Sequence, residues 1–234
     1  MTPPTAPTDA VAPDGSPVEV FARLPAEPAA GYVLGAVPAG ASVLELGCGA
    51  GRLTRALTAA GHPVVAVDES PEMLAHVEAP AQRVLGDAAE IRLPTRFGAV
   101  VLASYLVNHA DRGAAFLATA ARHVAPEGVV VVQRYDPNWV RDARNGAATV
   151  GPVTVAVTHL RAGPDRFEAT VVYTVDGRRW EQAVRAAIID DDDLDDLAAA
   201  VGLAVDRWLD EHRTWAVLVR PAVKRRAGAV PTRA

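Results

Sequence analysis

The sequence predicts an α/β fold built on a parallel sheet, and its pattern of apolar residues is the basis for this prediction. Short, continuously apolar runs alternate with segments of helical periodicity from residue 43 to residue 132. Strands that are apolar on both faces are typical of parallel sheets covered by helices on each side. Half of the 234 residues are hydrophobic, which is enough for a sizeable buried core.

The first half of the chain supplies five expected strands and the helices between them. Ser70 and Pro71 are a helix N-cap and a first-turn proline, whereas Gly61 marks a helix end. Asp111 can cap a later helix, which Pro126 and the glycine after it would terminate. The expected strands are 43–46, 64–67, 83–85, 97–103 and 129–132, and the helices begin near 52, 70 and 111.

The pattern changes after the fifth strand. Residues 153–160, 167–175 and 178–189 indicate three longer strands, and Asp176-Gly177 is a strong hairpin signal between the last two. We therefore expect a three-stranded antiparallel insertion. A helix over 193–201 and a strand pair, 203–208 and 214–219, close the core. The acidic run at 190–196 fits the first turn of that helix better than a metal site, because carboxylates there complement the helix dipole.

Composition limits the function classes. The net charge of −5 argues against a nucleic-acid or anionic-membrane surface. The chain has one cysteine, no long apolar run and no visible signal peptide, so a cytoplasmic protein is expected. Residues 1–17 and 221–234 are expected to be disordered tails. The remaining divisions are a core at 18–135, an insertion at 136–189 and closing elements at 190–220.

The stretch "VLELGCGAGRLTRAL", residues 43–57, turns a strand through alternate glycines into a helix, which is a ligand-binding arrangement. A dinucleotide, a phosphate and a sulfonium cofactor are the candidate ligands. Arg52 stands where the dinucleotide fingerprint has its third glycine, and Glu45 is unfavourable beside a phosphate. Asp68 and Asp87 follow later strands, where carboxylates can reach adenosine. These acids favour a cofactor with adenosine and a cationic end, as in S-adenosylmethionine (SAM).

The chain resembles the class I SAM-dependent methyltransferases, in their small-molecule branch. The resemblance rests on "VLELGCGAGRLTRALTAAGHPVVAVDESPEML", "GDAAEIRLP" and "FGAVVLASYLVNH", and covers about residues 40–135. It implies a Rossmann-like sheet of seven strands with the last strand antiparallel, and a lid-like insertion after strand five. It also implies cofactor contacts from Glu45, Gly47, Cys48, Gly49, Gly51, Asp68, Glu69, Met73, Asp87, Ala88 and Ser104.

The stretch "SYLVNHADR" after strand four is expected beside the methyl donor. His109 is the candidate general base, because its ordinary pKa lies near neutrality, and a purely positioning role is its alternative. Tyr105 is the second catalytic candidate. The expected acceptor-binding residues are Asn108, Arg134, Tyr135, Trp139 and His159, although sheet packing is the favoured explanation for His159 and for Trp180.

Several other chemistries are disfavoured. Cys48 lies inside the glycine turn, so a cysteine nucleophile that attacks cytosine is absent, and Ser104-Tyr105-Leu106 replaces the motif typical of adenine methylation. We see no metal site. The sequence thus predicts methyl transfer to an oxygen or nitrogen atom of a small molecule, with a homodimer as the candidate assembly. The alternatives are a non-catalytic SAM-binding partner protein and a nucleotide-dependent oxidoreductase.

Overall fold

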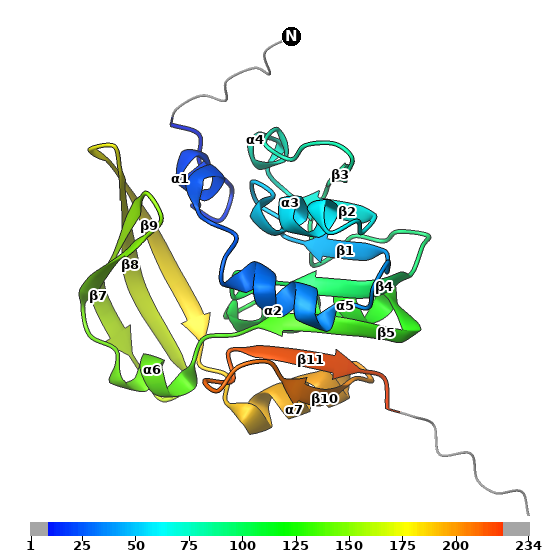
Figure 1. Ribbon diagram of the computed structural model, residues 1–234. Coiled ribbons are helices and arrows are strands. Elements are labelled where there is room, and N and C mark those ends of the chain that lie inside the picture. The colour runs from blue at the N-terminus through cyan, green and yellow to red at the C-terminus, as the bar shows by residue number, and fades with distance from the viewer. Residues whose placement is uncertain (1–8, 222–234) are drawn as a thin grey trace, which may run out of the picture.

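The computed structural model describes residues 9–221, which form two sheets with helices around the larger one (Figure 1). The larger sheet has seven strands, and β11 runs antiparallel to both of its neighbours. The predicted seven-stranded sheet with an antiparallel last strand is therefore confirmed. In spatial order the strands are β10 (Ala204–Trp208), β11 (Trp215–Val219), β5 (Val124–Gln133), β4 (Phe97–Leu102), β1 (Val43–Leu46), β2 (Val64–Asp68) and β3 (Gln82–Leu85).

Two separate hydrophobic clusters cover the two faces of this sheet. On one face, α2 (Ala29–Ala36) and α3 (Arg52–Ala59) pack against alternate strand residues such as Val101. On the other face, α5 (Gly113–His123) and α7 (Asp191–Ala200) pack against the strand residues that alternate with these, such as Val100. Continuously apolar strands are the sequence signature of this two-sided burial.

The insertion is a separate antiparallel sheet of four strands, so the predicted number of three was wrong. The strands are β6 (Gly146–Val150), β7 (Val153–Ala162), β8 (Arg166–Val175) and β9 (Arg178–Ala187), and α6 (Pro137–Asp142) precedes them. The missed strand, β6, is short, and every residue in it is exposed, so it carries no alternation that periodicity could detect. The hairpin at Asp176-Gly177 is present, with positive φ at both residues.

The buried amide of Asn108 joins the insertion to the core. Asn108 lies at the end of the short 3₁₀ helix η1 (Leu106–Asn108) and is fully buried. Its Nδ2 donates to the Ala187 carbonyl at 2.9 Å, and its Oδ1 accepts from the Tyr135 backbone N–H at 3.0 Å. Asn108 was expected to bind the acceptor, but these two bonds occupy its amide in a structural role.

The N-terminal segment is ordered from residue 9, where a disordered tail to residue 17 was expected. Val11 pairs with Pro17 in an isolated bridge, and the chain then enters α1 (Val18–Arg23). We call residues 10–23 the N-terminal strap, because it lies between the insertion and the elements around α4 (Pro71–Leu74) (Figure 1). Of the tails expected at 1–17 and 221–234, residues 1–8 and 222–234 lie outside the described residues. No helix within 9–221 has the length and apolarity to cross a bilayer.

Gly113 is the first residue of α5, and the fold leaves no room for a side chain at this position. A Cβ at this position would lie 2.0 Å from the carbonyl oxygen of Val107, a backbone atom of the loop before α5. Gly113→Ala should therefore lower the free energy of unfolding by about 3 kcal/mol or more, measured by urea denaturation.

Gly35→Ala is the matched control, because no heavy atom lies within 4 Å of a Cβ placed there. That substitution in α2 should leave stability unchanged or raise it by about 0.5–1 kcal/mol. Equal effects of the two substitutions would contradict the steric explanation.

Candidate cofactor and acceptor site

The turn after β1 has the backbone geometry that its glycines predict. Gly47, Gly49 and Gly51 all have positive φ, at 67°, 54° and 78°. A Cβ on Gly47 would lie 2.7 Å from Leu106 Cδ1, so close approach as well as conformation requires glycine here. The Cys48 backbone N–H donates to the Val67 carbonyl at 2.9 Å and fixes the turn to β2. The turn therefore presents bare backbone beside the loop that follows β4.

Asp68 holds the carboxyl end of β2 against this turn. Its Oδ2 accepts from the Gly49 N–H at 2.7 Å, and its Oδ1 accepts from the Ser70 N–H at 3.0 Å. Burial raises the pKa of Asp68, while these backbone bonds oppose the rise. Each carboxylate oxygen has a second lone pair, so the group can still accept from a ligand hydroxyl.

Glu45 is a buried acid directly behind the turn. Its Oε2 accepts from Thr54 Oγ1 at 2.5 Å, and only 2% of the residue is exposed. Burial raises the pKa of Glu45 to about 7, against the lowering effects of the Thr54 bond and of the Arg52 charge. Thr54 was not singled out in the sequence, because a threonine within a helix carries no motif of its own.

Arg52 is the cation closest to Glu45 along the chain, and it lies between the turn and the β4 loop. Its guanidinium makes only long hydrogen bonds, to the Pro25 carbonyl at 3.4 Å and to Ser104 Oγ at 3.5 Å. Burial lowers the pKa of Arg52, while the charge of Glu45 opposes that change. A carboxyl group and a guanidinium therefore lie together at the end of the site where the amino-acid part of SAM is expected.

Arg112 links two acids that were expected to bind adenosine. It forms an ion pair with Asp87, lies 3.8 Å from a Glu69 oxygen, and stacks 5.0 Å from the Phe116 ring centre. Asp87 Oδ1 also accepts from the Ala89 N–H at 2.8 Å. Arg112 was missed, because an arginine just before a helix gives no sequence signal for partners on other strands.

The other predicted cofactor contacts have mixed surroundings. Ala88 is buried beneath α5. The Ser104 N–H donates to Gln133 Oε1 at 2.8 Å. Met73 was expected to pack on adenine, but it is 2% exposed and packs with Ala50 and with two residues of the N-terminal strap. The strap therefore covers the surface on which the adenosine end was expected.

Two tyrosines form the centre of the acceptor side. Tyr105 and Tyr135 stack with ring centres 3.9 Å apart and planes 7° from parallel, and Tyr135 meets Phe167 of β8 edge-on at 5.2 Å. Ser104 and Tyr105 both have positive φ, 54° and 62°, although neither is glycine. Such strained backbone persists only where its surroundings enforce it, and it is common at functional sites.

The remaining predicted acceptor residues are not part of this aromatic group. His109 packs edge-on to Phe116 at 6.2 Å, and its Nδ1 accepts weakly from the Asp111 N–H at 3.4 Å. Trp139 is 49% exposed on α6, and His159 is exposed on β7. Neither has a ring contact or hydrogen bond with the tyrosines within residues 9–221.

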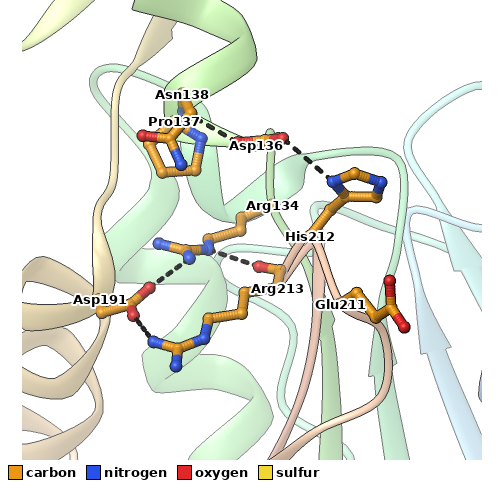
Figure 2. A pocket seen from close by; sticks show the side chains of 8 residues that line it. All are labelled: Arg134, Asp136, Pro137, Asn138, Asp191, Glu211, His212 and Arg213. Atoms are coloured by element: carbon orange, nitrogen blue, oxygen red, sulfur yellow. Dashed lines mark hydrogen bonds and ion pairs between the residues drawn. The ribbon is translucent and has the colours of Figure 1, made fainter.

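Arg134 was expected to bind the acceptor, but the structure gives it other partners. Its guanidinium donates to the carbonyls of Arg213 and Ile189 at 2.8 and 2.7 Å, pairs with Asp191, and lies 4.5 Å from the Trp208 ring centre. Figure 2 shows Asp191 between Arg134 and Arg213. These residues line a cavity of about 250 Å³, apart from the glycine turn, in which His212 faces Asp136. Arg134 therefore stabilises the junction of β5, α7 and the β10–β11 loop.

The acidic run before α7 is confirmed as a helix cap. Asp190 and Asp193 form a reciprocal capping box at the N-terminus of α7. Within the described range, no three His, Cys, Asp or Glu side chains gather in a way that could hold a metal ion.

Comparisons with known proteins agree with this geometry. Residues 44–132 match the family described as "Methyltransferase domain". The chain is 34% identical over 107 residues to the ubiquinone biosynthesis O-methyltransferase of Rhodopseudomonas palustris (43% of this chain, 42% of the relative). It is 33% identical over 139 residues to the cypemycin N-terminal methyltransferase of a Streptomyces species (53% and 57%). The matched stretches thus span about half the length of these relatives.

Solved structures extend the likeness to most of the chain. The SAM-bound amino pentose methyltransferase CalS10 of Micromonospora echinaspora superposes with a TM-score of 0.62 and 25% identity. That superposition covers 83% of this chain and 89% of CalS10. The fold around the glycine turn is therefore shared well beyond the matched domain.

The raised pKa of Glu45 predicts a pH-dependent stability. Between pH 4.5 and about 7 the folded state holds a proton that the unfolded state has lost, so the contribution of Glu45 to stability falls as the pH rises. Glu45→Gln should match the native protein below pH 4.5 and exceed it by roughly 3 kcal/mol above pH 7. Urea denaturation across this range measures the difference.

Glu181→Gln is the control, because Glu181 is exposed on β9, where it pairs with Arg179. A Glu45→Gln difference that stays constant with pH would show that Glu45 titrates normally.

Proposed function

We propose that this protein transfers a methyl group from SAM to an oxygen or nitrogen atom of a small molecule, because residues 44–132 match a methyltransferase domain and the fold is shared with a SAM-bound methyltransferase. The observation that supports this best is the glycine turn with the Asp68 carboxylate bonded to the Gly49 N–H. It sets bare backbone and a carboxylate that could accept ribose hydroxyls side by side at the carboxyl edge of a parallel sheet, where ligands of such folds bind.

The residues present fit SAM. The positive-φ glycines give backbone access, Asp68 retains free lone pairs for ribose hydroxyls, and Asp87 with Ala88 would face the adenine. Glu45 and Arg52 suit the ammonium and carboxylate of the amino-acid end. When bound, SAM supplies an activated methyl group on sulfur. The protein's part is then to hold donor and acceptor in line and close together.

The surroundings of His109 favour a positioning role over that of a general base. Its ring packs against Phe116, and its Nδ1 accepts a backbone N–H, so the imidazole supports the loop before α5. Oxygen and nitrogen acceptors are both represented among the printed names of the relatives. The intact turn and acids also argue against a protein that only binds SAM, and Arg52 argues against a nucleotide-dependent oxidoreductase.

Asp68→Ala should weaken binding of S-adenosylhomocysteine (SAH) by about 1–3 kcal/mol, because a charged hydrogen-bonding group is lost. Isothermal titration of SAH into the native protein and the variant measures the change. Asp206→Ala is the control, since that acid lies on β10 and pairs only with its neighbour Arg207. No SAH binding by the native protein at millimolar ligand would refute the proposed function. An unchanged affinity in Asp68→Ala would remove only the role of Asp68.

A further inference from the structure

The stacked tyrosines present hydroxyl groups that have no hydrogen-bond partner. The Tyr173 hydroxyl on β8 donates to Gln182 Oε1 at 2.9 Å, whereas neither Tyr105 nor Tyr135 has a side-chain hydrogen bond within residues 9–221. Tyr105 is 37% exposed and Tyr135 is half-buried, so their hydroxyls are accessible polar groups. Two accessible phenols without a side-chain partner, on adjacent parallel rings, can therefore donate to and accept from a ligand.

This pair lies next to the expected methyl donor. Tyr105 directly precedes Leu106, which meets the open side of Gly47, and it follows Ser104, whose hydroxyl lies 3.5 Å from the Arg52 guanidinium. Tyr135 comes from the end of β5, and Phe167 covers its far edge from the insertion. The two phenols thus lie where the core, the glycine turn and the insertion meet.

Within residues 9–221, no side chain in ring contact with this pair is a base for a hydroxyl acceptor. Burial raises the pKa of Tyr105 and, more strongly, that of Tyr135, and the Tyr173 phenol has a raised pKa as well. All three are neutral near neutral pH. Arg52 is a cation, and His109 contacts Phe116 instead of the tyrosines. An alcohol would have to lose its proton here, whereas an un-ionised amine already has a lone pair to donate.

We propose that the acceptor is a small-molecule amine, and that the Tyr105 and Tyr135 hydroxyls position its nitrogen; this inference rests on the proposed function. The phenol oxygens accept the amine N–H bonds and leave the nitrogen lone pair directed at the methyl carbon. A nitrogen–carbon bond forms, the carbon–sulfur bond breaks with its electron pair going to sulfur, and the resulting ammonium releases a proton to water. No further reactant is required.

The charge of the surroundings narrows the class of amine. Acids outnumber cations on the cofactor side of the site, so a phosphorylated or carboxylated acceptor would be repelled on approach, whereas a cationic amine in solution would be attracted. The aromatic walls suit an apolar body next to the nitrogen. The acids are Asp14, Glu45, Asp68, Glu69 and Asp87, and the cations are Arg52, Arg55 and Arg112.

Matched probes test this assignment in two steps. SAH binding is measured first, because its absence would refute the proposed function and not this inference alone. The SAH-loaded protein is then titrated with benzylamine and with benzyl alcohol at one alkaline pH. The variants are Tyr105→Phe and Tyr135→Phe. Tyr32→Phe is the control, because Tyr32 belongs to α2 and its ring stacks on Trp215 instead of on either tyrosine of the pair.

Benzylamine should bind at least about tenfold more tightly than benzyl alcohol, and each site variant should remove about tenfold of its affinity, as one hydrogen bond predicts. Tyr32→Phe should bind both probes like the native protein, and all variants should keep the native SAH affinity. With labelled SAM, mass spectrometry should find the added methyl on the amine, with the variants raising KM more than they lower kcat. Equal or tighter binding of the alcohol, no binding of the amine, methylation of the alcohol, or unchanged site variants would each overturn the assignment.

Discussion

The two-sided bonding of the buried Asn108 amide is the constraint on which the acceptor side depends. Its donor and acceptor groups are both used, one on the last residue of β9 and one on the backbone of Tyr135. Leaving either buried partner unsatisfied would be costly, so the loop after β4, the end of β5 and the insertion are held in one arrangement. Tyr105 and Tyr135 stack because this bond fixes the loop that carries one against the strand that carries the other.

The core could be predicted from the sequence because its signals are local. Val43–Leu46 and Val64–Asp68 are apolar on both faces, and only a helix-covered parallel sheet buries such strands completely. The same rule failed for Gly146–Val150, since an exposed strand of small residues has no pattern to recognise. Residues 9–17 were misjudged for a related reason. Their composition resembles a disordered tail, and their order comes from contacts with Met73 and Gln182, far away in the chain.

The candidate site also contains residues that local spacing could predict and residues whose roles depend on distant partners. The positive-φ glycines and Asp68 lie within one strand-turn-helix-strand unit, so their spacing alone placed them together. Arg112 bridges acids that follow two different strands, and the structural role of Arg134 depends on a loop 79 residues later. Long-range pairs of this kind leave no periodicity. An arginine at the end of a strand has the same sequence signature whether it binds a ligand or carbonyl oxygens of its own fold.

The two halves of the site differ in charge, and this difference bears on methyl transfer itself. The cofactor side holds the acids, which suit a sulfonium, whereas the acceptor side holds phenols whose raised pKa values keep them neutral. During transfer to an amine, positive charge spreads from sulfur toward nitrogen. Carboxylates near the acceptor would favour the protonated amine, which has no lone pair to donate. A neutral aromatic surface favours the un-ionised amine instead, so separating the acids from the tyrosines keeps the nucleophile reactive while the donor remains bound.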